Sequence, residues 1–154
     1  MNKLDELLVH LERFIPESNT TNKDVSAATV GWHIEHILLV LDAVAGALLK
    51  SNPGKYKWSF NVKKMYVLTF GKLPRGKIKA PTVVQPASFN IDSLQQHLSE
   101  TRKKVQSLET IKNNHFFTHP FLGDIKLPAA KKFMYIHTRH HIHIIDDIVN
   151  ANMQ

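Results

Sequence analysis

Apolar residues recur every three or four positions in four stretches of the chain, which is the spacing of amphipathic helices. Ser26 and Asp92 are residue types that cap helices, and Pro128 suits the first turn of a helix. Gln95, three residues after Asp92, completes a capping-box pattern. We therefore predict four helices, at residues 2–14, 26–50, 92–108 and from 128 through 148.

The connections between these helices are long and irregular. Residues 56–70 carry a weak helical pattern, and the GKLPRGKIKAPTVVQP stretch after them is punctuated by Pro and Gly without periodicity. A second irregular stretch, HFFTHPFLGDIKLP, precedes the last helix. A long connection in a small domain fits a crossover along a helical bundle. We therefore predict an all-α fold in one domain over residues 1–154, a four-helix bundle with a long crossover loop and a short inserted helix.

The composition indicates a single globular domain and excludes several kinds of cysteine chemistry. With 154 residues, 43% of them apolar, the chain is large enough for one hydrophobic core. The absence of cysteine excludes disulfide scaffolds, Cys-based zinc ribbons, thiol nucleophiles and iron–sulfur ligation. Acidic residues lie among the N-terminal leucines, and Asp42 interrupts the longest apolar run, residues 37–49. These features predict a cytoplasmic protein with no membrane partner.

The positive charge is concentrated in one segment. The net charge is +7, and residues 54–79 contain eight Lys or Arg residues and no acid. Such a segment can bind an anionic substrate or nucleic acid, or it can be a solvated loop. Because no nucleic-acid-binding motif accompanies the charge, nucleic acid is the less favoured partner.

Histidine is the main candidate for chemistry. The chain has 10 histidines, and four of them lie within residues 137–143. At about 100° per residue, His137 and His141 fall within the same stripe of the last helix as Phe133, Ile144 and Ile148. The pair therefore occupies positions where apolar core residues are expected.

A third histidine is available on the second predicted helix. His33 lies about 60° from the centre of the apolar stripe and His36 about 120° from it, so we expect His33, and not His36, to face the other helices. Neutral imidazoles one helical turn apart suit a divalent transition metal, and three protein ligands leave positions open for water or substrate. The alternative is that these histidines are core or surface residues hydrogen-bonded to Tyr, Asp or backbone groups.

Two motifs resemble a known family. The segment Ser26-Ala-Ala-Thr-Val-Gly-Trp-His33-Ile and the later segment Phe133-Met-Tyr-Ile-His137-Thr-Arg-His140-His141-Ile are similar to the corresponding parts of the DinB/YfiT-like superfamily. The PRGKIKAP and HPFLG elements are similar to those of a bacterial branch of it. The resemblance implies a four-helix bundle with a three-histidine site for nickel, zinc or iron. By position the ligands would be His33, His137 and His141, with His36 as the alternate if the register differs.

The resemblance also implies candidate reactions. Characterised relatives include S-transferases that use a low-molecular-weight thiol, bacillithiol or mycothiol, and metal-dependent hydrolases. A metal in such a site activates water or holds a thiol as thiolate. On this interpretation the partner is a small-molecule substrate or thiol, and Arg75 and Lys77 of the basic segment would bind an anionic group of the thiol cofactor. Two alternative functions stay open: a non-catalytic bundle with structural histidines, and a basic nucleic-acid-associated protein. With any of these functions, the chain can form a homodimer through apolar helix faces.

Overall fold

The computed structural model describes residues 3–74 and 81–153. Within these ranges the fold is mostly helical, with one small sheet. The helices are α1 (Lys3–Glu12), α2 (Val30–Lys50), α3 (Val62–Phe70), α4 (Ile91–Ser107) and α5 (Leu127–Ala151), and the strands are β1 (Phe116–His119) and β2 (Gly123–Lys126).

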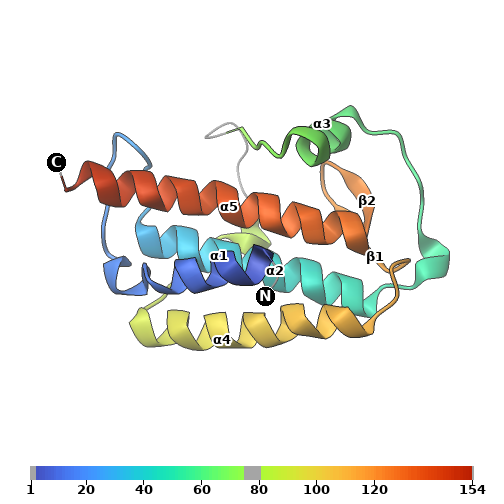
Figure 1. Ribbon diagram of the computed structural model, residues 1–154, viewed down its shortest axis with the longest axis horizontal. Helices are drawn as coiled ribbons and strands as arrows, with labels where there is room; N and C mark the ends of the chain where they lie inside the picture. The colour runs from blue at the N-terminus through green and yellow to red at the C-terminus, as the bar shows by residue number, and fades with distance from the viewer. Residues whose placement is uncertain (1–2, 75–80, 154) are drawn as a thin grey trace.

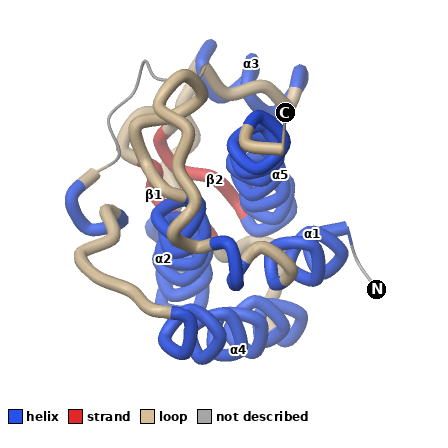
Figure 2. Tube along the Cα trace, turned by 90° about the vertical axis from the view of Figure 1, so that its left-hand side faces the viewer, coloured by secondary structure: helices blue, strands red, loops and turns tan. Residues whose placement is uncertain are grey.

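Four of the helices form a bundle. Helix α2 contacts α4 and α5, and α1 also contacts α4 and α5, so the four surround one core (Figures 1 and 2). The core is built from leucine and isoleucine side chains that are fully buried, among them Leu8, Leu41, Leu98 and Ile145. The predicted four-helix arrangement with a short inserted helix is therefore found, and α3 is the inserted helix, packed on α5.

Helix α2 is the central helix of the bundle. Among the helices of residues 3–74 and 81–153, it is the one that is long and apolar enough to cross a membrane, and 56% of its apolar window is buried inside the protein. A buried core helix passes the same test of length and composition. The contacts of α2 with both α4 and α5 account for its apolar sequence.

Helix α2 begins four residues later than predicted. Its N-cap is Thr29, whose Oγ1 accepts a hydrogen bond from the Trp32 amide at 3.0 Å. Ser26 is not the cap, because it ends the preceding turn, in which its own amide donates a hydrogen bond to the Asn22 carbonyl. Its hydroxyl instead accepts from the Ala28 amide and pairs with His33. The N-cap of α2 is therefore Thr29, because the predicted cap, Ser26, is part of the turn that precedes the helix.

Helix α4 is capped by a different pair from the one predicted. Asn90 is the N-cap, and its side chain and that of Ser93 form a reciprocal capping box. Asp92 and Gln95 lie inside the helix and are exposed. An Asn at the N-cap is as effective as an Asp, so the sequence pattern did not distinguish the two registers.

The all-α prediction is wrong between α4 and α5. Strands β1 and β2 pair antiparallel there, with Phe117 opposite Ile125 and both side chains buried. Gly123 has a φ of 70°, a left-handed conformation that glycine adopts without strain. The hairpin covers one end of the core beside α2 and α5.

Candidate metal site

Three histidines from two helices converge in the bundle. The candidate ligand atoms of His36 on α2 and of His137 and His141 on α5 all lie within 4.8 Å of one another. His36 is 4% exposed and His137 is 9% exposed. These three residues are called the histidine triad below. The i, i+4 spacing of His137 and His141 places both imidazoles on the face of α5 that meets α2.

The expectation that His36 points away from the helix interface is wrong. Its Nδ1 donates a hydrogen bond to the Val84 carbonyl at 2.7 Å, and the Trp32 ring stacks on its imidazole at 5.0 Å between centroids. Because a carbonyl only accepts, Nδ1 carries the proton and Nε2 keeps its lone pair. A proton held by a backbone carbonyl is the usual way in which a protein orients a metal-binding imidazole.

His33 lies beside the triad and contacts one of its members. Its Nε2 pairs with the Ser26 hydroxyl at 3.0 Å, and its Nδ1 pairs with Nδ1 of His141 at 3.0 Å. Both ring nitrogens of His33 therefore have partners within the protein. The structure brings together the predicted His137 and His141, adds His36, and places His33 behind His141.

Burial keeps the triad neutral. Desolvation lowers the pKa of His36, and it lowers the pKa of His137 well below the ordinary value. The pKa of His141 is also lowered, first by burial and then by the neighbouring imidazoles of His137 and His36. A neutral imidazole has a lone pair to offer, so the triad is in the protonation state that a metal requires.

The residues present fit a divalent transition metal. Nδ1 of His137 is buried and has no hydrogen-bond partner among the residues described. An imidazole nitrogen in that state costs about 1–3 kcal/mol unless something binds it. Zn–N distances of about 2.0–2.1 Å place three tetrahedral ligand nitrogens roughly 3.3 Å apart. The candidate ligand atoms of the triad lie within 4.8 Å of one another, so the side chains would move closer together to bind one ion. Three imidazoles without thiolate suit zinc, nickel, copper or iron.

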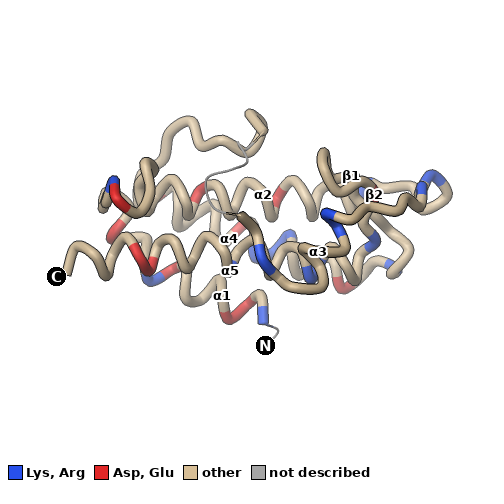
Figure 3. Tube along the Cα trace, turned by 90° about the horizontal axis from the view of Figure 1, so that it is seen from above, with Lys and Arg blue, Asp and Glu red and all other residues tan. Residues whose placement is uncertain are grey.

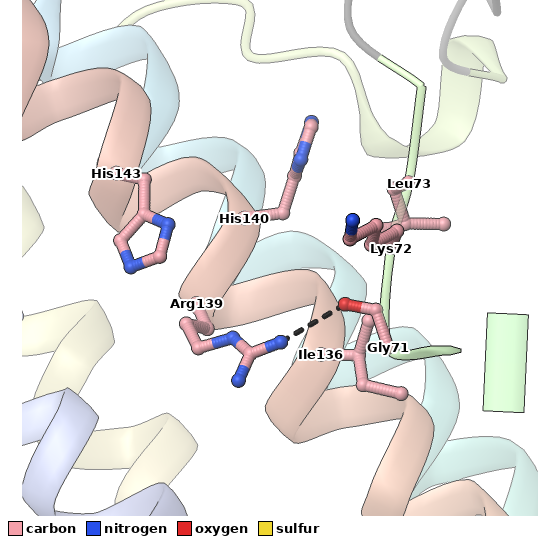
Figure 4. A pocket seen from close by; sticks show the side chains of 7 residues that line it. All are labelled: Gly71, Lys72, Leu73, Ile136, Arg139, His140 and His143. Carbon is pink, nitrogen blue, oxygen red and sulfur yellow. Dashed lines mark hydrogen bonds between the residues drawn. The ribbon is translucent and has the colours of Figure 1, made fainter. Parts of the chain in front are cut away.

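A half-open recess of about 290 Å³ lies between α5 and the segment that follows α3, and Figure 4 shows the residues that line it, none of which is a member of the triad. Lys72 and Arg139 line it, together with the imidazole of His140, whose centroid is 5.1 Å from that of His141. Nη2 of Arg139 donates to the Gly71 carbonyl at 2.9 Å, which holds the guanidinium at the edge of the recess. The predicted anion-binding residues Arg75 and Lys77 lie outside the described residues. Lys72 and Arg139 are cations that sequence reasoning did not select.

A polar cluster around a single histidine, His97, lies where α2 meets α4. His97 of α4 pairs through Nδ1 with the Glu35 carboxylate at 2.9 Å, and its Nε2 is 3.6 Å from Oδ2 of Asp42. Asp42 also accepts hydrogen bonds from Thr101 and Lys104, each at 2.9 Å. The hydrogen bond to Glu35 is the main reason why the pKa of His97 is raised. His97 therefore links α4 to α2 through two carboxylates.

Comparisons of the chain with protein-family models, with curated proteins and with solved structures give no match.

Proposed function

We propose that this protein binds one divalent transition-metal ion through His36, His137 and His141. The observation that carries the proposal is the buried, unpartnered Nδ1 of His137 within a group of three converging neutral imidazoles. His33 supports the site by holding Nδ1 of His141, and the Val84 carbonyl holds Nδ1 of His36. The resemblance to the DinB/YfiT-like superfamily implies a three-histidine site with His137 and His141, and the proposal replaces its His33 with the alternate, His36.

The proposed reaction is the transfer of a thiol or the hydrolysis of a small molecule. A bound divalent ion supplies Lewis acidity toward a thiol or water. The chain's own contribution is to exclude solvent around His36 and His137 and to bind a negatively charged part of the substrate. Lys72 and Arg139 are placed for that second task, in a recess that begins one side chain from the triad.

The test is the metal content of untagged protein, purified without added metal and measured by mass spectrometry. About one ion per chain is expected in the wild type and in His143→Ala, an exposed histidine of the same helix. His141→Ala is expected to lose the ion while circular dichroism shows an intact fold. Metal-free wild type, even after incubation with nickel, zinc and iron, would mean that the triad is a set of core residues.

The recess is tested separately with inorganic phosphate as the probe. Binding followed by calorimetry is expected to weaken in Lys72→Ala and to stay unchanged in Lys132→Ala, an exposed lysine of α5 that does not line the recess. Equal affinity in the two variants would remove the anionic substrate from the proposal and leave the metal site unaffected.

A further inference from the structure

Helix α3 turns its apolar stripe toward solvent. Val62, Met65, Tyr66 and Phe70 follow the spacing i, i+3, i+4 and i+8, which places them on one face, and each is between 49% and 67% exposed. The opposite face carries the buried Val67 and packs on α5. An amphipathic helix normally buries its apolar stripe in the protein, so this stripe has the arrangement of a helix made to contact something else.

The segment before α3 extends this apolar surface. Trp58 is 75% exposed and Phe60 is 69% exposed. Phe121, also exposed, joins them at the turn of the hairpin, because the Asn61 side chain donates to its carbonyl at 3.0 Å. The aromatic face, as it is called here, consists of Trp58, Phe60, Val62, Met65, Tyr66, Phe70 and Phe121. Exposed apolar patches of this kind mark interaction surfaces.

Lysines are frequent in the segment that carries most of the aromatic face. The segment from 54 to 74 contains five lysines and no acid: Lys55, Lys57, Lys63, Lys64 and Lys72. Figure 3 shows basic positions near α3 and in the adjoining loops. Asp124 of β2 is the acidic neighbour, and its carboxylate already accepts hydrogen bonds from the Lys57 amide and the Thr118 hydroxyl. A binding partner that matches this surface must therefore offer both an apolar environment and negative charge.

We propose that the aromatic face docks this protein on an anionic membrane surface, with α3 lying in the plane of the lipid headgroups. Aromatic and aliphatic side chains enter the headgroup boundary, and lysines around them bind anionic lipid. This proposal departs from the sequence prediction of no membrane partner, which rested on the N-terminal acids and on the short, interrupted apolar run, because the aromatic face attaches to a membrane surface without a spanning segment. The inference is independent of the metal site.

Other occupants fit the aromatic face less well. Protein–protein interfaces are depleted in lysine, and a second copy docked on the same face would bring lysines against lysines. Single-stranded nucleic acid stacks its bases on rings, whereas Val62 and Met65 offer none. A lipid surface uses all three features of the face, its rings, its aliphatic side chains and its positive charge.

The experiment is co-sedimentation with vesicles, in EDTA so that no metal contributes. We expect binding to phosphatidylcholine vesicles containing 30% phosphatidylserine, at least tenfold weaker binding to pure phosphatidylcholine, and a blue shift of tryptophan fluorescence that Trp58→Ala removes. Met65→Ser with Phe70→Ser is expected to abolish binding, while Val9→Ser, an exposed apolar residue of α1, leaves it unchanged. Lys55→Glu and Lys63→Glu are each expected to weaken it about fivefold or more.

Three results would overturn the proposal. One is the absence of binding to either vesicle by folded protein at low salt. Another is a stable dimer in ultracentrifugation that Met65→Ser with Phe70→Ser dissociates, because the aromatic face would then belong to a second copy. The third is tight, salt-dependent binding of a single-stranded oligonucleotide that Trp58→Ala removes, together with no vesicle binding.

Discussion

Two neighbouring residues of α2 belong to two clusters of opposite electrostatic character, one with a single histidine and one with three. Glu35 faces α4 and pairs with His97, whereas His36 faces α5 and joins His137 and His141. In the first cluster carboxylates raise the pKa of the imidazole. In the second, burial among other imidazoles lowers the pKa of each member.

The difference shows what decides the role of a buried histidine in this bundle. Beside Glu35 and Asp42 the protonated form of the imidazole is favoured, and His97 links α2 and α4 through these two carboxylates. In the triad the neutral form is favoured, and the lone pair of each ring is kept for another partner. The same residue type thus holds helices together on one side of α2 and forms a candidate ligand set on the other.

The largest effect is expected for His137→Ala. The variant loses a ligand with an unpartnered buried nitrogen, so metal content should fall from about one ion per chain to nearly none. His97→Gln, a substitution in the other cluster, should retain the ion. Mass spectrometry of both proteins measures this contrast directly. If both variants lost metal equally, the two clusters would not be separate.

A second comparison separates a ligand from its support. His36→Asn should remove most of the bound metal, because its Nε2 is one of the three donors. His33→Asn should only weaken metal affinity, by about 10–100-fold, since His33 acts through Nδ1 of His141. Competition titration with a chromogenic chelator gives both affinities. The opposite order of effects would restore His33 as the ligand expected from the family resemblance.

The exchange of His33 for His36 shows where sequence reasoning stops. Helical periodicity located the helices and put His137 and His141 on the inner face, because α5 meets α2 along a single stripe. It failed on α2 because that helix is covered on more than one side. The segment around Val84 covers a further side of α2 and buries His36. Helical periodicity cannot predict this contact, because the segment lies far from α2 in the sequence.

The remaining differences have the same origin. Ser26 does not cap α2 because it belongs to the preceding turn, and the sequence could not choose between Asn90 and Asp92 because both residue types are effective caps. The hairpin between α4 and α5 was missed because its strands are only four residues long and read as loop. The recess residues Lys72 and Arg139 come from segments 67 positions apart, and no local pattern joins them.

The pH dependence of stability should distinguish the two clusters. The raised pKa of His97 means that its contribution is fully present below about pH 6.5, its ordinary value, and is lost as the pH rises through its folded value. Wild type should therefore exceed His97→Gln by about 1.5–3 kcal/mol at pH 5.5, and by less at pH 9. Urea denaturation in EDTA measures the difference. The lowered pKa values of the triad give the opposite trend, because its contribution to the free energy of unfolding falls as the pH drops below about 6.5. This contribution is the same in wild type and in His97→Gln, so it cancels in their difference. A difference that grew with pH would contradict the assignment.

The smallest effect concerns the hydrogen bond that holds Asp42 in place. Thr101 is fully buried, and its hydroxyl donates to Oδ1 of Asp42 at 2.9 Å. Thr101→Val keeps the shape and removes the donor, so the free energy of unfolding should fall by about 1 kcal/mol. Asp42 would keep its contacts with Lys104 and His97, and the metal content should not change. Ser99→Val, an exposed position on α4, is the matched control. Asp42 and His36 lie on the same helix and have different partners, so a loss of metal in Thr101→Val would show that the two faces of the helix are coupled.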